Sequence, residues 1–195
     1  MIGCMFNVKK FVETKIEEIR RTVGSERVVA ACSGGVDSTT AMYLTHKAIG
    51  SNLLAVFIDD GLRREGEPQW VARLLEKLGM NAKVVDKSEL FFSALRGLTD
   101  AEEKRKRFRE TFYATIGETT KAEGARFLVQ GTIAADIAET VGGVKSQHNV
   151  LEQIGIDPKS YGFELIEPLK ELYKNEVRAV ARNLHLPRDV TERMP

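Results

Sequence analysis

The chain has 195 residues, of which 43% are hydrophobic, a length that suits one well-buried domain and is short for two. Lys and Arg number 29 against 28 Asp and Glu, so the net charge of +1 gives no global reason to expect a nucleic-acid or membrane partner. Two cysteines outside any metal-like cluster argue against a disulfide scaffold or a zinc site. Without a signal-peptide pattern or a membrane-length apolar run, we expect a cytoplasmic protein.

Short apolar runs alternate along the chain with segments in which apolar residues recur every three or four positions, the spacing of an amphipathic helix. In chain order, the predicted elements are a helix at 8–23, a strand at 28–32, a helix at 37–49, a strand at 53–58, a helix at 65–79, a strand at 82–85, helices at 89–92 and 100–123, a strand at 126–129, a helical piece at 136–140, a strand at 163–166 and a helix at 172–184. This alternation predicts an α/β fold, a doubly wound, mostly parallel sheet of about five strands with helices on both faces.

The ends of the predicted strands are polar or rich in glycine. Ligands of doubly wound sheets lie outside the carboxyl ends of the strands, so we expect several of these ends to converge on one nucleotide. The four segments are Ser33-Gly34-Gly35, Asp59-Asp60-Gly61, Asp86-Lys87-Ser88 and Gln130-Gly131-Thr132.

The loop between the first strand and the next helix predicts a cradle for an anion. Gly34 and Gly35 let the backbone turn sharply and present consecutive N–H groups, and Ser33 and Ser38 add hydroxyl donors. The following helix would direct its positive dipole end into the same place. The loop lacks the lysine of a Walker motif and carries Asp37, which suits bound phosphates when Mg²⁺ lies between them. The plainer alternative is an ordinary strand-to-helix turn with a serine cap.

The motif Ser33-Gly34-Gly35-Val36-Asp37-Ser38 resembles the pyrophosphate-binding loop of the N-type ATP pyrophosphatases, the adenine nucleotide alpha hydrolase group. More selective matches to one family of that group, the GMP synthetases, follow in the same order at 57–64, 99–106, 130–132, 144–150 and 165–178. Over nearly its whole length, the sequence therefore resembles the ATP pyrophosphatase domain of the GMP synthetases.

The resemblance implies a ligase that uses ATP and Mg²⁺. In that family, ATP activates the C2 oxygen of xanthosine monophosphate (XMP), pyrophosphate leaves, and ammonia displaces AMP to give GMP. Such catalysis rests mostly on positioning and on charge neutralisation at the phosphoryl oxygens. The expected partners are XMP, a separate glutamine amidotransferase subunit that supplies ammonia, and a second copy in a homodimer.

The resemblance also implies roles for individual residues. Asp37 would hold Mg²⁺ and would act in catalysis together with Lys145 and His148. The residues expected to bind the nucleotide are Ser33, Gly34, Gly35, Val36, Asp37, Ser38, Asp59, Arg64, Gln130, Gly131, Thr132, Asp136 and Glu139. Taken singly, Asp59 also fits an ordinary turn, and Lys145 and His148 also fit solvated loop residues.

Three positions depart from the family's pattern. Asp60 stands where histidine or asparagine is common, Arg109 where glycine is common, and Gln147 where the first of two histidines is usual. The sequence ends where GMP synthetases continue into a dimerisation domain, and neither cysteine has the setting of a glutaminase nucleophile. We therefore expect one ATP pyrophosphatase domain over 1–195, without a dimerisation or glutaminase domain.

Two other functions remain open at this point. One is a different N-type ATP pyrophosphatase ligase, which forms an amide or modifies a base or a tRNA. The other is a regulatory module that binds ATP without catalysis. Pyrophosphate release separates both enzymes from the module, and the dependence of that release on XMP separates the two enzymes from each other.

Overall fold

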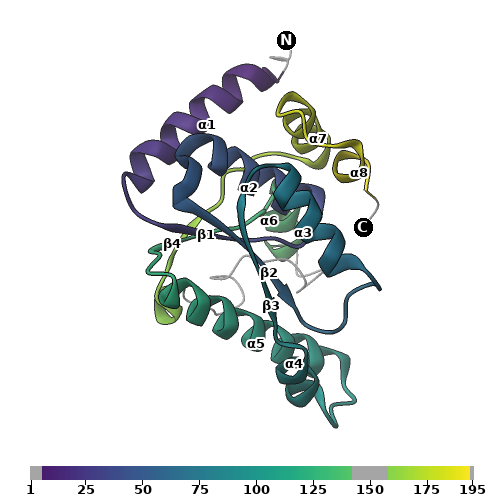
Figure 1. Ribbon diagram of the computed structural model, residues 1–195. Helices are drawn as coiled ribbons and strands as arrows, with labels where there is room; N and C mark the ends of the chain where they lie inside the picture. Colours follow the sequence, from purple (N-terminus) through teal and green to yellow (C-terminus); the bar gives the residue numbers. More distant parts are fainter. Residues whose placement is uncertain (1–5, 142–157, 194–195) are drawn as a thin grey trace.

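The computed structural model describes residues 6–141 and 158–193, in which strands and helices alternate as predicted (Figure 1). The strands are β1 (Val28–Ala31), β2 (Leu53–Asp59), β3 (Asn81–Asp86), β4 (Phe127–Val129) and β5 (Glu164–Ile166). The helices are α1 (Val8–Val23), α2 (Val36–Ile49), α3 (Glu67–Lys77), α4 (Ser88–Leu95), α5 (Ala101–Ala122), α6 (Ala134–Val141), α7 (Lys174–Asn183) and α8 (Arg188–Thr191), with 3₁₀ turns η1 (Gly50–Asn52) and η3 (Pro158–Tyr161). Every predicted element is confirmed with bounds shifted by a few residues, whereas the short helix α8 was not predicted.

The five strands form one parallel sheet in the order β3-β2-β1-β4-β5. From the central strand β1 the chain moves outward to β2 and β3, and then returns to the other side of β1 to add β4 and β5. The strand order therefore reverses between β1 and β4, which confirms the doubly wound topology. A crevice outside the carboxyl ends of the strands forms at such a reversal.

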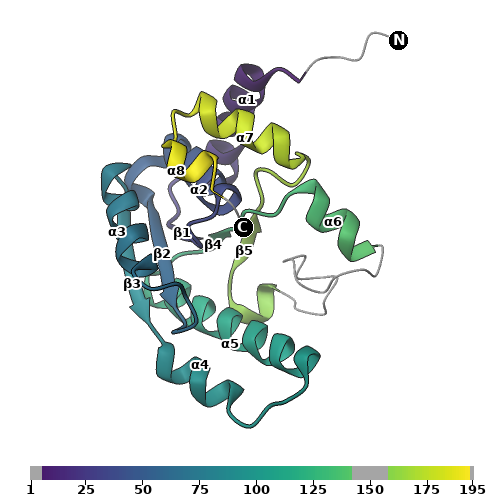
Figure 2. The ribbon, with the colours of Figure 1, turned by 90° about the vertical axis from the view of Figure 1, so that its right-hand side faces the viewer.

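Helices cover both faces of the sheet, as Figures 1 and 2 show. Alternate residues of a strand point to opposite faces. Ala30 and Phe57 pack in a core with residues of α1, α2, α3 and α7, whereas Val29 and Val56 pack in a second core with residues of α4 and α5. Each central strand is buried on both sides, which accounts for the continuous apolar runs in the sequence.

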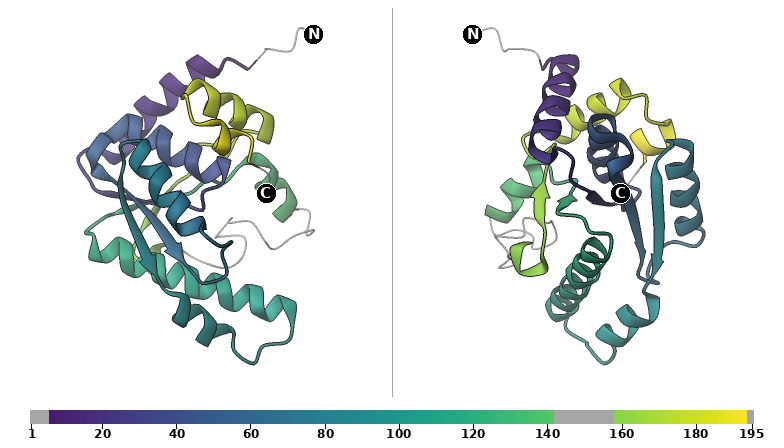
Figure 3. Two further views of the ribbon diagram at one scale, coloured as in Figure 1. Left: turned by 45° about the vertical axis from the view of Figure 1, so that its right-hand side comes forward. Right: turned by 60° about the vertical axis from the view of Figure 1, so that its left-hand side comes forward.

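The helix ends follow from local sequence. Asn7 caps α1 by accepting a hydrogen bond from the N–H of Lys10 at 3.0 Å, and Gly24, with φ at +60°, ends that helix. Asp100 caps α5 in the same way, by accepting from the N–H of Glu103 at 2.8 Å. Figure 3 shows that the first half of α5 and the antiparallel helix α4 extend past the sheet.

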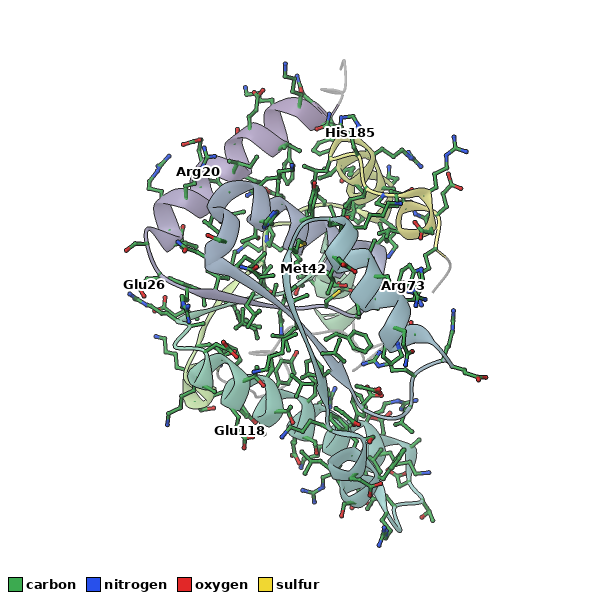
Figure 4. The ribbon with its side chains drawn as sticks, viewed as in Figure 1. Arg20, Glu26, Met42, Arg73, Glu118 and His185 are labelled. Carbon is green, nitrogen blue, oxygen red and sulfur yellow. The ribbon has the colours of Figure 1, made fainter. Side chains whose placement is uncertain are left out.

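Helices α1, α2, α3, α7 and α8 form one layer against the sheet, the upper layer in Figure 1. Within it, α7 and α8 from the C-terminal part of the chain both pack against α2. In Figure 4, Met42 of α2 lies inside this layer, while Arg73 and Glu118 point outward from α3 and α5. Within 6–141 and 158–193, the helices are all too short or too polar to cross a membrane.

Candidate functional site

A cleft of about 820 Å³ opens at the carboxyl ends of β1, β2 and β4. Its walls come from the loop after β1 and the first turn of α2, from the segments that follow β2 and β4, from residues of α3, α5, α6 and α7, and from Arg193. The cleft lies where the order of the strands reverses, which is the expected place for a ligand in a doubly wound sheet.

The loop after β1 is held open by its own serines. The hydroxyl oxygens of Ser33 and Ser38 are 2.9 Å apart, and the Ser33 N–H donates to the Ser38 hydroxyl at 3.2 Å. Helix α2 begins after Gly35, which supplies no side-chain cap. The positive end of the helix dipole is thus left without a capping side chain at its N-cap and faces the cleft, as an anion site requires.

The segment after β4 lies directly against the first turn of α2. A Cβ atom on Gly131 would stand 2.5 Å from the backbone nitrogen of Ser38 and 2.7 Å from its Cα. No side chain fits there, so glycine is required for the two segments to meet. This contact places the polar segment after β4 next to the loop that follows β1.

Asp37 and Lys174 form an ion pair beside this loop. Their Oδ2 and Nζ atoms are 2.6 Å apart, and the two residues stand 137 positions apart in the sequence. The second carboxylate oxygen of Asp37, Oδ1, is buried and has no hydrogen-bonding partner within the described residues. A buried carboxylate oxygen left in this state is suited to a hard cation.

One wall of the cleft is apolar and carries a buried amide. Ala31, Val56 and Phe112 form this wall on the α5 side of the sheet. Gln130 is 4% exposed, donates from Nε2 to the hydroxyl oxygen of Tyr113 at 3.1 Å, and leaves its Oε1 atom without a partner among the described residues. Burial raises the pKa of Tyr113 well above its usual range, so the phenol keeps its proton. Such a wall can accommodate a flat heteroaromatic ring and read one of its edges.

Beyond Gln130, two further side chains are fixed by hydrogen bonds. The Thr132 hydroxyl donates to Glu167 at 2.6 Å, and Asp136 accepts from the N–H of Ile133 at 2.9 Å at the start of α6. Both Thr132 and Asp136 line the cleft. Their positions are therefore set by the ends of β4 and β5 rather than by a free loop.

Most of the residues predicted to bind a nucleotide are brought together by the structure. Those that line the cleft are Ser33, Gly35, Val36, Asp37, Ser38, Arg64, Gln130, Gly131, Thr132 and Asp136. Gly34 is not among the residues that line the cleft, and its carbonyl oxygen accepts a hydrogen bond from Arg193. Glu139 belongs to α6, but its side chain lies outside the described part of the chain, and the predicted catalytic residues Lys145 and His148 lie outside it entirely.

Two of the predicted strand ends contribute fewer residues to the cleft than expected. The Asp59 side chain accepts from the N–H of Gly61 at 3.0 Å and is not among the residues that line the cleft. The end of β3 also stays away, because β3 is the edge strand and is separated from β1 by β2. There, Asp86 accepts from the N–H and the hydroxyl of Ser88, which lowers the pKa of this exposed carboxyl.

Asp60, one of the departures from the family's pattern, organises the loop after β2. It is 1% exposed, accepts from the N–H of Leu62 at 2.9 Å and pairs with Arg63 at 2.7 Å. The Arg63 guanidinium lies 5.6 Å from the centre of the Phe57 ring and lines the cleft. A buried acid at this position thus directs a cation toward the cleft.

Lys174, Arg193 and Arg63 are cleft residues that were not predicted from the sequence. Lys174 and Arg63 lie inside the segments that match the GMP synthetases, so the resemblance could have indicated both as site residues. Arg193 reaches the loop after β1 from the end of a helix that was not predicted, and no local pattern marks it. The packing of α8 on α2 and the contacts of Arg193 with α3 bring it there.

Curated proteins of known name are similar to this chain in sequence. A relative from Saccharolobus solfataricus, named as the B subunit of a glutamine-hydrolyzing GMP synthase, is 52% identical over 98% of this chain and 52% of its own length. The corresponding protein from Methanopyrus kandleri, which has the same name, is also 52% identical, over 98% of this chain and 60% of its own length. The chain thus spans between half and two thirds of these relatives.

Solved structures confirm the fold. NMN synthetase from Francisella tularensis superposes with a TM-score of 0.73 at 17% identity, over 97% of this chain and 76% of the other. NH3-dependent NAD synthetase from Campylobacter jejuni gives 0.72 at 18% identity, over 96% and 77%. The family model described as NAD synthase matches residues 5–195. The chain therefore belongs to the NAD synthase family.

Proposed function

We propose that the chain is the ATP pyrophosphatase part of a GMP synthase, which adenylates XMP and releases pyrophosphate. Relatives named as a GMP synthase subunit are 49–52% identical over at least 95% of this chain. The observation that carries the proposal is the loop from Ser33 to Ser38, held by its serines at the start of α2 and open to the cleft. Backbone N–H groups at a helix N-terminus suit the β- and γ-phosphates of ATP.

Two parts of the cleft would bind two different parts of ATP. The loop after β1 would hold the pyrophosphate portion, and the apolar wall of Ala31, Val56 and Phe112 would receive the adenine ring. Gln130 lies on the same face as that wall and would meet the edge of the base. This division follows from the alternation of strand residues, which sends the apolar wall and Gln130 to the α5 side.

Mg²⁺ is part of the same proposal. Asp37 Oδ1, buried and unpartnered among the described residues, would supply one oxygen ligand, and phosphate oxygens would supply others. No group of three His, Cys, Asp or Glu side chains that could hold a metal occurs in the described ranges. When bound, such an ion neutralises charge on the phosphoryl oxygens.

The proposed reaction has two steps. The C2 oxygen of XMP bonds to the α-phosphorus of ATP while the neighbouring ring nitrogen of the purine loses its proton, the bond from the α-phosphorus to the bridging oxygen breaks, and pyrophosphate leaves. Ammonia then bonds to C2, the C2–oxygen bond breaks, and AMP leaves with that oxygen, while the nitrogen loses a proton to give GMP. The chain's own share is to hold the leaving pyrophosphate in the loop, with Lys174 beside Asp37 adding positive charge.

The proposal includes a partner. The relatives are named as one subunit of a glutamine-hydrolyzing enzyme. We propose that a separate glutamine amidotransferase subunit supplies the ammonia, and that Lys145 and His148 act in catalysis from the segment between α6 and η3.

The test is the release of pyrophosphate and AMP from ATP in the presence of XMP, Mg²⁺ and an ammonium salt. We expect pyrophosphate release to require ATP, XMP and Mg²⁺, and AMP release to require ammonium as well. Asp37→Asn should lower both rates by about 10²-fold or more, because the substitution removes the anionic ligand proposed for Mg²⁺. Asp189→Asn, at an exposed position of α8, is the matched control and should leave the rate unchanged.

Two outcomes would contradict the proposal in different ways. If ATP binds but no nucleotide elicits pyrophosphate release, the chain is a non-catalytic ATP-binding module. If release occurs with an acceptor other than XMP and not with XMP, the chain is a different ligase of the same group.

A further inference from the structure

Gly34, in the middle of the anion loop, is enclosed by three side chains, one of which, Arg193, also lines the cleft. It has φ at +74°, a left-handed conformation that glycine adopts without strain. A Cβ atom at this position would stand 2.9 Å from Val71, 3.0 Å from Trp70 and 3.0 Å from the Nη1 atom of Arg193. The conformation of the loop is therefore restricted by α3 and by Arg193, which follows α8.

Arg193 makes three different contacts at this point. Its Nη1 donates to the carbonyl oxygen of Gly34 at 3.2 Å, its Nη2 donates to Glu67, and its guanidinium lies 4.3 Å from the centre of the Trp70 ring. The Arg193 and Glu67 side chains are only 20% and 12% exposed. A planar guanidinium can hold two acceptors in its plane and an aromatic ring on its face, which a lysine ammonium cannot do at once.

Glu67 joins this cluster to a second wall of the cleft. One of its carboxylate oxygens accepts from Arg193, and the other accepts from the backbone N–H of Arg64 at 3.2 Å. The segment after β2 and the end of α8 are thus tied to one carboxylate. The position of Arg193 is consequently determined by α3 rather than by a flexible side chain alone.

The bond to the Gly34 carbonyl decides where the next N–H group points. The described peptide bonds are all trans, and in a trans peptide the C=O and the following N–H point in opposite directions. Because Arg193 binds the Gly34 oxygen, the N–H of Gly35 points the opposite way, toward the Ser33 hydroxyl at 3.4 Å.

We propose that Arg193 is a positioning residue for the anion loop. By binding the Gly34 carbonyl, it keeps the N–H groups of the loop aimed at the place where the phosphates of a nucleotide bind. The effect on loop order follows from the geometry alone. The effect on nucleotide affinity rests in addition on the function proposed above.

The first test is hydrogen–deuterium exchange of the ligand-free protein, followed on peptides that cover 32–38. Arg193→Lys keeps the positive charge but loses the planar guanidinium and its paired N–H donors, so these amides should exchange about tenfold faster. The exchange rates of amides in β1 and β2 should stay unchanged. Glu67→Gln, which weakens one of the three contacts, should give a smaller change in the same direction. Arg188→Lys, at an exposed position of α8, is the control and should match the unaltered protein.

The second test is calorimetric binding of Mg-ATP and of adenosine to the same variants. Arg193→Lys should weaken Mg-ATP about tenfold or more and leave adenosine unchanged, because adenosine does not reach the loop. Lost Mg-ATP affinity with unchanged exchange would overturn the proposal in favour of direct phosphate contact. Faster exchange throughout the chain would also overturn the proposal, because it would show that the substitution destabilises the whole fold. If the unaltered protein does not bind Mg-ATP, the proposed function fails while the exchange result still decides the role of Arg193.

Discussion

The Gln130 amide depends on one hydroxyl group for its position. Tyr113→Phe keeps the buried ring but removes the oxygen that accepts from Gln130 at 3.1 Å. We expect the free energy of unfolding to fall by about 1–2 kcal/mol and ATP affinity to fall several-fold, because the amide can then turn away from the base. Urea unfolding and calorimetry measure both, and Tyr43→Phe on α2 is the control. Unchanged ATP affinity would show that Gln130 does not need this anchor.

Cys32 adjoins the anion loop but is poorly suited to be a nucleophile. Burial raises the pKa of its thiol to about 11. At pH 8, which lies below both pKa values, raising the pKa by about two lowers the thiolate fraction about a hundredfold. In a Cys4→Ala background, iodoacetamide should therefore alkylate the folded protein about a hundredfold more slowly than the urea-unfolded chain. Equal rates would show that the thiol is accessible and ionised.

At the scale of elements, the close contact between the end of β4 and the start of α2 can be tested by substituting Gly131. Gly131→Ala places a methyl group 2.5 Å from the Ser38 nitrogen, so the elements must separate. We expect a loss of several kcal/mol of stability together with most of the Mg-ATP affinity. Gly97→Ala is the control: its φ is +77° but its Cβ would meet no atom within 4 Å, so it should cost about 1 kcal/mol and leave binding unchanged.

If Gly131→Ala bound Mg-ATP normally, β4 would not help to shape the loop. Thermal unfolding and calorimetry of the two alanine variants make that comparison directly.

The elements themselves were predictable because each has a local cause. The periodic apolar residues, the caps Asn7 and Asp100 and the terminating Gly24 all act within a few residues along the chain. Helix α8 escaped prediction because it has four residues, too few for a helical period to show. The loop after β1 was also predictable, since its glycines and serines are adjacent in the sequence.

At the scale of the whole molecule, the sequence indicated which strand ends are polar but not which of them meet. That choice depends on the strand order, which places β1 beside β4 and puts β3 at the edge. Pairs such as Asp37 with Lys174 and Gly34 with Arg193 join residues more than 130 positions apart, so no local pattern contains them. The family resemblance marked Lys174 only as part of a matching segment, and gave no sign of its partner.

The proposed reaction in the cleft is the transfer of the adenylyl group of ATP to an oxygen of XMP. It is tested most directly with XMP that carries ¹⁸O at C2, incubated with the protein, ATP, Mg²⁺ and ammonium, followed by mass spectrometry of the products. The account predicts one ¹⁸O atom in each AMP and none in pyrophosphate. Label retained in the purine product, or found in pyrophosphate or inorganic phosphate, would contradict it.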